Sequence, residues 1–240
     1  MREPTLRQRR VLSLVFVGAI MAALAAWAAT YTPIFRADHI RVLGATTLGP
    51  QAVRQLAGLD GSANVVHVDT DAIVSRLTAD PWIASASVER DLPSTLVVRV
   101  VERQPVALVA AMSDPTVLAT DGTLLPATGA TPTLPSMHAA VGAPDEFQRV
   151  AAADLLTSLD PIVLRRVDEV TVGQDGVVTL TLRDGVSVDA GVAGDEGAKA
   201  TALRAILRWS ATQHHELSTI DVSAPDAPSA TLANGSTVTP

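Results

Sequence analysis

The chain has 240 residues, no cysteine and a net charge of −7 at pH 7. Without cysteine it cannot form a disulfide framework or carry a lipid on an N-terminal cysteine, so packed cores must supply its stability. Residues 36–240 keep 24 of the 25 acidic and 14 of the 18 basic side chains, a net charge of −10. Such a composition lacks the excess of positive charge that binding to nucleic acid or to anionic lipid requires.

An uncharged stretch from Val11 to Phe35 follows arginines at positions 2, 7, 9 and 10. Its most apolar part, residues 11–29, would span about 28 Å as a helix, close to the thickness of the hydrocarbon core of a bilayer. The arginines predict a cytoplasmic tail at residues 1–10, a transmembrane helix at residues 11–31 and an exported C-terminal body. The expected anchor side chains are Val11, Leu14, Phe16, Ile20, Leu24 and Trp27.

A cleaved signal peptide is the alternative, since small residues flank Trp27 near the end of the stretch. The apolar core of a signal peptide is usually about 7–15 residues, which is shorter than the stretch observed. The length therefore favours a retained anchor.

The segment after the anchor carries the signals of a small α+β unit. A short strand is expected at residues 38–43, and a helix at residues 50–57 has proline in its first turn. A second helix is expected to begin at Asp69 or Thr70 and to end at residue 79. Two alternating strands, residues 84–89 and 95–100, complete a β-α-α-β-β order.

Such a small sheet leaves at least one edge strand unpaired. An unpaired edge either needs protection or serves as a docking surface. Which of the two applies to this edge bears directly on function.

Three spaced motifs lie in and just after this unit: Asp-Pro-Trp-Ile at 80–83, Ala-Ser-Val-Glu-Arg-Asp-Leu-Pro-Ser-Thr-Leu at 86–96 and Val-Val-Glu-Arg-Gln-Pro-Val-Ala at 100–107. With their order behind one N-terminal hydrophobic segment, they resemble the FtsQ/DivIB family of bacterial cell-division proteins. The strand at residues 40–44 resembles the opening strand of the family's POTRA domain. The resemblance implies a POTRA domain at residues 35–104 and a β-rich, FtsQ-type mixed α/β domain at residues 105–222.

Residues within these motifs also have structural interpretations of their own. Pro93 is expected to fix the entry into a hairpin, and Arg90 and Glu102 to face each other or solvent across paired strands. Pro105 is expected to end the ladder where the chain leaves the first domain. None of these residues is expected to be catalytic.

The second domain shows short strands, then helices and a strong hairpin signal. An amphipathic helix is expected to begin near residue 144, with Phe147, Ala151 and Leu155 on its apolar face. Asp184-Gly185 is a two-residue hairpin loop between alternating strands. The other expected elements are strands at 106–110, 117–119, 167–172, 178–182, 186–188 and 217–222, a helix at 198–212 and a surface excursion at 123–143.

The C-terminal region carries the docking hypothesis. Residues 217–222 resemble a late strand of the family's β domain, and residues 223–240 are expected to form a further strand or a tail. In the family this region binds small single-pass coiled-coil membrane proteins of the FtsB/DivIC and FtsL type. A partner segment is expected to pair with an exposed strand edge here, at Leu217, Ile220, Val222, Thr231, Leu232 and Ala233.

The sequence predicts no catalytic, metal or cofactor site. The five histidines are scattered, and no nucleophile-elbow pattern lies beside a serine. His214 and His215 would point about 100° apart on a helix, which is poor for chelation. Neither a P-loop nor a dinucleotide fingerprint is present.

The favoured function is therefore a non-enzymatic, single-pass scaffold in the cytoplasmic membrane at the division septum. It is expected to dock other division proteins and to coordinate septal wall synthesis, as the resemblance implies, without nucleic acid or small-molecule substrate. One alternative is a POTRA-bearing export component, although such proteins usually carry several POTRA repeats or a barrel. Another is a secreted wall hydrolase or lectin released by cleavage after Ala28.

Overall fold

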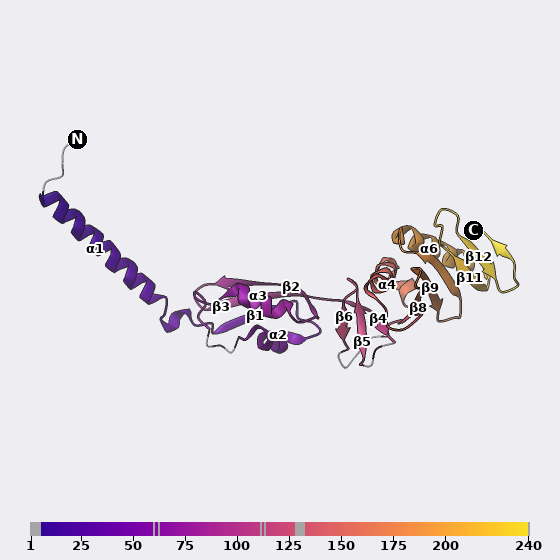
Figure 1. The fold of residues 1–240 in the computed structure, drawn as a ribbon, viewed down its shortest axis with the longest axis horizontal. Coiled ribbons are helices and arrows are strands. Elements are labelled where there is room, and N and C mark those ends of the chain that lie inside the picture. Colours follow the sequence, from indigo (N-terminus) through magenta and orange to yellow (C-terminus); the bar gives the residue numbers. More distant parts are fainter. Residues whose placement is uncertain are drawn as a thin grey trace, which may run out of the picture. The chain divides into compact units, whose positions relative to one another are not determined.

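The computed structural model describes residues 6–59, 61, 63–110, 112, 114–127 and 133–239, with side chains from residue 14 onward. The chain divides into two compact units, Met1–Glu102 and Arg103–Pro240. Each unit has its own sheet and its own hydrophobic core, and Figure 1 labels most of their elements.

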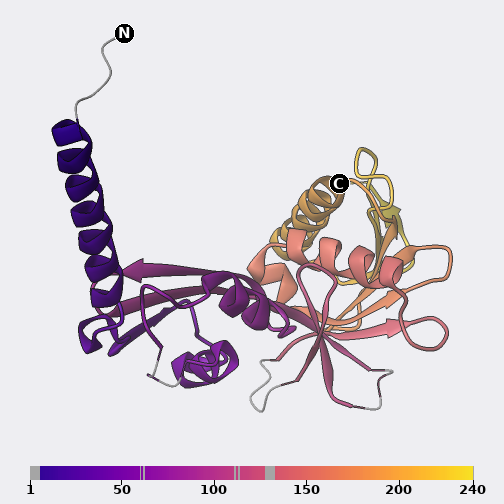
Figure 2. The ribbon, with the colours of Figure 1, turned by 60° about the vertical axis from the view of Figure 1, so that its left-hand side comes forward.

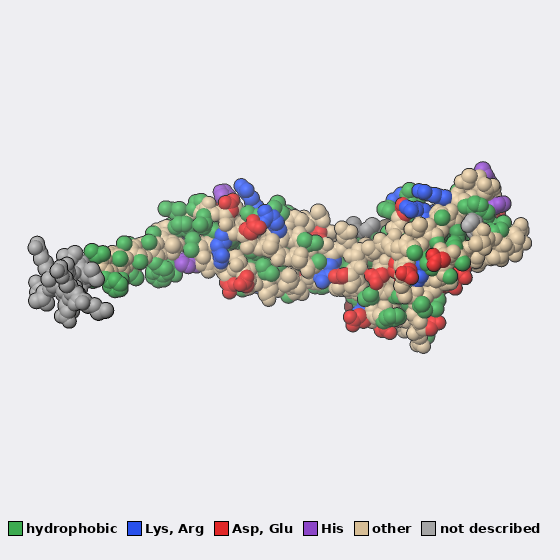
Figure 3. Space-filling view, turned by 90° about the horizontal axis from the view of Figure 1, so that it is seen from above, with side chains coloured by type: hydrophobic (Ala, Val, Ile, Leu, Met, Phe, Trp, Pro, Cys, Tyr) green, Lys and Arg blue, Asp and Glu red, His purple; other side chains and the backbone are tan. Residues whose placement is uncertain are grey.

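Helix α1 (Leu6–Ala29) begins the first unit. The large apolar side chains described on it are all exposed; Leu14 is 72% and Phe16 is 68% exposed, and hydrophobic side chains line this segment in Figure 3. In the part of the chain that the structure describes, none of the helices is both long and apolar enough to cross a membrane. Residues 1–5 of the expected tail and the side chain of Val11 lie outside the described residues, and the anchor stays a prediction.

The rest of the first unit has the β-α-α-β-β order expected from the sequence. Its three-stranded sheet has the order β1-β3-β2, with β1 parallel and β2 antiparallel to β3. Alternate residues of β3 (Leu96, Val98) pack with Ile73 and Leu77 of α3 in one core, so the helices cover one face of the sheet. The elements are η1 (Pro33–Phe35), β1 (His39–Leu43), α2 (Gly49–Ala57), α3 (Thr70–Thr78), β2 (Ile83–Asp91) and β3 (Thr95–Glu102).

The predicted motif contacts differ from those in the structure. Arg90 donates from Nη2 to the carbonyl of Val68 at 2.8 Å, whereas Glu102 accepts hydrogen bonds from residues 46–48. The two side chains therefore do not face each other, since in the β2–β3 register Arg90 lies opposite Leu96; Arg90 is instead exposed to solvent, which was the other arrangement expected. Pro105 does not end a ladder either, because it begins β4 and lies opposite Ala119.

The second unit contains one mixed sheet of ten strands among its described residues. The strand order is β13-β12-β11-β10-β9-β8-β7-β4-β5-β6. The elements are β4 (Pro105–Val109), β5 (Thr116–Ala119), β6 (Leu124–Pro126), β7 (Ser136–Ala139), α4 (Glu146–Ser158), α5 (Pro161–Leu164), β8 (Val167–Val172), β9 (Val177–Leu182), β10 (Ser187–Val192), α6 (Glu196–Gln213), β11 (Leu217–Asp221), β12 (Ser229–Leu232) and β13 (Thr237–Val238).

One face of this sheet is packed and the other is polar. Val178, Leu180 and Leu182 of β9 are buried in the core that also contains residues of α4 and α6, and Figure 2 shows these helices together beside the strands. The alternate residues Thr179 and Thr181 lie on the other face and are only half-buried. The alternation read from the sequence therefore identified the buried face, and the Asp184-Gly185 hairpin joins β9 and β10 as predicted.

Helix α4 departs from its predicted packing at one residue. Asp145 caps its N-terminus and accepts from the Gln148 N–H at 2.8 Å, while the Gln148 side chain accepts from the Asp145 N–H at 3.0 Å. Phe147 was expected on the apolar face but is 59% exposed. It lies over Gly176 instead, where an added Cβ would come within 2.7 Å of the ring.

Candidate docking edges

Strand β11 lies inside the sheet and not at its edge. It pairs in parallel with β10 and antiparallel with β12, so both of its hydrogen-bonding edges are occupied. Ile220 and Val222 are each 1% exposed and belong to the core, and Leu217 is half-buried against it. The expectation of an open edge at residues 217–222 is therefore wrong, because the sequence pattern did not reveal the second neighbour.

The sheet ends at β12 and β13, which come from the region expected to be a strand or a tail. Thr231 lies on the polar face, Leu232 is 9% exposed on the core side, and Ala233 is exposed in the following turn. Strand β13 pairs with β12 at Ala230↔Val238 and Thr231↔Thr237. The predicted residues 231–233 therefore lie next to the sheet edge.

The sequence analysis did not identify Thr237 and Val238 as a separate strand. The pair Asn234-Gly235, which stands between two short runs of alternating residues, could have indicated it, because Asn-Gly in this setting is a strong signal of a β-hairpin. Gly235 has φ +87°, and the Asn234 Oδ1 atom accepts from the Ser236 N–H at 3.0 Å and from its hydroxyl at 2.6 Å. These bonds hold the turn that returns the chain to β12.

The hydrogen bonds at this turn show which backbone groups of β12 point outward. The Ala233 N–H donates to the Glu216 carbonyl at 2.8 Å, toward β11, and the Leu232 N–H donates to the Ser236 carbonyl at 2.9 Å, away from it. Because successive residues of an antiparallel strand alternate in direction, the Ala230 N–H also points toward the outer edge. Ala230 and Leu232 are thus the β12 donors on the side away from β11.

The opposite end of the ten-stranded sheet offers less to an incoming strand. Its outermost strand, β6, has three residues and ends at Pro126, which lacks an amide hydrogen and cannot donate to a ladder. Proline at a sheet edge is a common protection against unwanted pairing.

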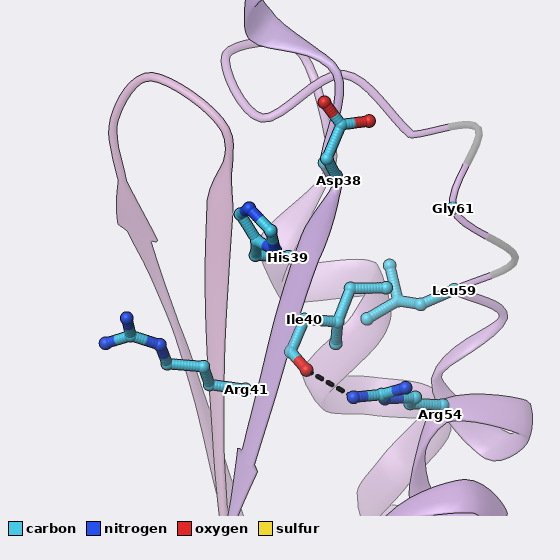
Figure 4. Close-up of a pocket in the computed structure, with 8 residues that line it drawn as sticks. Asp38, His39, Ile40, Arg41, Arg54, Leu59 and Gly61 are labelled. Atoms are coloured by element: carbon cyan, nitrogen blue, oxygen red, sulfur yellow. Dashed lines mark hydrogen bonds between the residues drawn. The ribbon is translucent and has the colours of Figure 1, made fainter.

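In the first unit, β1 borders a groove of about 550 Å³. Figure 4 shows Arg54 reaching across this groove, where its Nη2 atom donates to the Ile40 carbonyl at 2.6 Å. Asp38, His39 and Arg41 of this segment also line the groove. Because Arg54 already binds one carbonyl on this edge of β1, an incoming strand would have to displace it.

Two carboxylates with shifted pKa values hold loops in place. Partial burial alone would raise the pKa of Glu102, but hydrogen bonds from Leu48, Thr47 and Thr46 outweigh it and lower the pKa below its ordinary value. Burial would likewise raise the pKa of Asp121, but the bond from Arg103 Nε at 2.6 Å and those from Thr123 lower it. Both groups are ionised at neutral pH and act as acceptors for neighbouring segments.

Titratable groups do not converge into a reactive centre within the described ranges. No three histidine, aspartate or glutamate side chains there lie close enough to hold a metal ion. His138 and Glu169 lie 3.8 Å apart on neighbouring strands, and the ring of His215 packs 5.0 Å from that of Trp209. These side-chain contacts are structural, and the chemistry that the sheet edges described above can provide is main-chain hydrogen bonding.

Family models match most of the chain. The model described as "POTRA domain, FtsQ-type" matches residues 35–103, and that described as "Cell division protein FtsQ/DivIB, C-terminal" matches residues 107–223. Together they cover β1 to β11, and β12 and β13 lie beyond the matched residues.

Curated relatives match over nearly the full sequence. The chain is 32% identical over 225 residues to the cell division protein FtsQ of Mycolicibacterium smegmatis, a match that covers 93% of this chain and 66% of that protein. It is 31% identical over 236 residues to the protein of the same name from Streptomyces collinus, covering 92% and 88%. The chain spans about two thirds of the length of the M. smegmatis relative and 62% of that from Mycobacteroides abscessus.

A solved structure gives a more distant match. The major extracytoplasmic domain of the trans isomer of the division protein DivIB from Geobacillus stearothermophilus is 22% identical, with a TM-score of 0.35. The alignment covers 47% of this chain and 95% of that domain. The assignment depends on the family models and the curated relatives.

Proposed function

Because the chain belongs to the FtsQ/DivIB family of bacterial cell-division proteins, we propose that it is a non-enzymatic membrane scaffold of the division machinery. In this proposal residues 11–31 anchor it as a single-pass protein in the cytoplasmic membrane at the septum, with the N-terminus inside. Both units lie outside, where they dock other division proteins and coordinate septal peptidoglycan synthesis. The proposed partners are small single-pass coiled-coil proteins of the FtsB/DivIC and FtsL type.

The observation that carries this proposal is the outer edge of β12. Its donors at Ala230 and Leu232 face away from β11, and only the two-residue strand β13 lies beyond them. An extended partner segment can pair with such an edge through main-chain hydrogen bonds, while its alternate side chains supply specificity. The core-side residues Ile220 and Val222 support the edge from within and are not contact residues.

Anchoring would strengthen this kind of docking. Confinement of both proteins to one membrane raises their effective concentration without any new contact. The net negative charge of residues 36–240 would also disfavour acidic partners through like-charge repulsion.

Localisation provides the first test. A functional fluorescent fusion of the full chain is expected to concentrate at midcell in dividing cells. Uniform labelling of the membrane throughout the division cycle would contradict a role at the septum.

Pull-down from membranes tests the edge itself. The variant Ala230→Pro removes a donor that points outward and leaves the β11 side of the ladder intact. We expect it to lose capture of the FtsB/DivIC-type partner, while the control Thr179→Ala, on the polar face of an interior strand, retains it. Full capture by a folded Ala230→Pro protein, checked by circular dichroism, would rule out docking at β12.

A further inference from the structure

Strand β13 covers the outer edge of β12 only in part. The two strands share two residue pairs, whereas β12 and β11 pair at four positions. Ser229, the first residue of β12, pairs with Asp221 on the inner side and has no residue of β13 in the outer register. The outermost strand of the sheet is therefore shorter than the edge that it borders.

The side chains of β13 nevertheless match the two faces of the sheet. Val238 is half-buried and packs against the large core, while Thr237 is exposed on the polar face. The hydroxyl oxygens of Thr237 and Thr231 lie 3.4 Å apart across the pair. β13 thus places an apolar side chain toward the core and a polar one on the open face, as any strand added here must do.

We propose that β13 is a placeholder, which occupies the edge of β12 in the free protein and leaves it when a partner strand binds. This inference rests on the docking edge of the proposed function. The incoming segment is extended, puts an apolar side chain where Val238 packs and a polar one beside Thr231, and continues past Ser229, whose backbone groups face β11, to the outward carbonyl of Pro228. It replaces the two residue pairs of β13 with a ladder that is longer by this one acceptor.

A second geometry makes the opposite prediction. A partner strand could instead add to the far side of β13 and leave the β12–β13 pairs intact. Fixing β13 in place would then preserve or improve binding. The two geometries are separated by a covalent lock between the strands.

Because the chain has no cysteine of its own, two introduced cysteines can form a disulfide within the chain only with each other. Because the Leu232 N–H bonds across to Ser236, the pair Thr231↔Thr237 is a non-hydrogen-bonded one. Its Cα atoms are then about 4.5 Å apart, which lies within the range that a disulfide bridges. The variant Thr231→Cys/Thr237→Cys is therefore expected to form a disulfide on oxidation. The matched control is Thr181→Cys/Ser187→Cys between the interior strands β9 and β10, a pair that is non-hydrogen-bonded for the same reason, because the Leu182 N–H bonds across to Val186.

The probe is the purified exported segment of the FtsB/DivIC-type protein, titrated against the full chain in detergent. We expect the oxidised lock to bind at least about tenfold more weakly than the same protein after reduction, with no redox effect in the control. Equal binding by the oxidised and reduced forms, with the disulfide verified by mass spectrometry, would overturn the placeholder and leave the docking edge standing. Absence of binding by every form, wild type included, would overturn both.

A variant without a covalent bond gives an independent readout. Val238→Pro removes a β13 donor that points toward β12, because the pair Ala230↔Val238, next to Thr231↔Thr237, is a hydrogen-bonded one, and we expect this variant to bind the probe more tightly than the wild type. Weaker binding by a folded Val238→Pro protein would indicate addition outside β13 and would also overturn the placeholder.

Discussion

The Glu102 carboxylate at the end of β3 binds Thr46, which lies just before α2. Glu102 Oε2 accepts from the Thr46 hydroxyl at 2.7 Å and from its N–H at 3.1 Å. It also accepts from the Thr47 N–H at 2.7 Å, and Oε1 accepts from the Leu48 N–H at 2.9 Å. A residue distant in sequence therefore caps the start of α2 and places a negative charge where the helix dipole favours one.

Loss of this cap should destabilise the first unit. We expect Glu102→Ala to lower the free energy of unfolding by about 2 kcal/mol, because several backbone donors lose a charged acceptor at once. Differential scanning calorimetry measures the effect. The control Glu89→Ala removes an exposed ion pair with Arg99 and should cost less than about 1 kcal/mol. Equal losses in the two variants would show that the cap has no special role.

The same carboxylate should make stability depend on pH. Since the pKa of Glu102 is lower in the folded protein than its ordinary value of 4.5, its stabilisation is complete above 4.5. It is lost as the pH falls through the lower folded value. We therefore expect the difference in unfolding free energy between wild type and Glu102→Gln, measured in urea, to shrink below pH 4.5. A difference that stays constant from pH 7 to pH 3 would contradict the assignment.

Gly44 at the end of β1 should not tolerate a side chain. Its φ is +86°, and an added Cβ would lie 2.0 Å from the Val100 carbonyl oxygen. We expect Gly44→Ala to destabilise the first unit by more than about 2 kcal/mol, from backbone strain together with the clash. Gly49→Ala isolates the strain, because Gly49 has φ +79° and no atom within 4 Å of the added Cβ. Thermal unfolding of both variants should show the larger loss at Gly44.

The variant Ile220→Ala distinguishes two possible roles of Ile220: packing in the core behind the docking edge, or direct contact with a partner. Ile220 is 1% exposed in the large core, so its truncation should lower the free energy of unfolding by about 2–5 kcal/mol. We expect partner capture per folded molecule to stay at the wild-type level. A stable Ile220→Ala protein that no longer captures the partner would instead make Ile220 a contact residue.

Local sequence signals predicted most of the elements. Asp69 caps α3 by accepting from the Ala72 N–H at 3.0 Å, and the Asp184-Gly185 turn joins the expected strands. Strand alternation at residues 178–182 correctly identified the buried face. These features depend on neighbours in sequence, which is why single-sequence patterns reveal them.

Features that depend on distant partners could not be predicted in this way. Nothing near Glu102 in the sequence indicates that it caps a helix that begins more than fifty positions earlier, and nothing in residues 217–222 shows that strands lie on both sides of them. Phe147 has helical spacing with Ala151 but lies over Gly176, a contact set by tertiary packing. The β13 hairpin is different, because its Asn234-Gly235 turn is a local signal that the sequence does contain.

The docking edge can be tested most directly by photo-crosslinking in dividing cells, with a photoreactive amino acid at Thr231 on the polar face beside the edge. Docking at β12 predicts an adduct with the FtsB/DivIC-type partner from this position and none from Thr179, which lies on the same face of an interior strand. An adduct from Ser87 on the edge strand β2, with none from Thr231, would contradict docking at β12 and place it on the first unit.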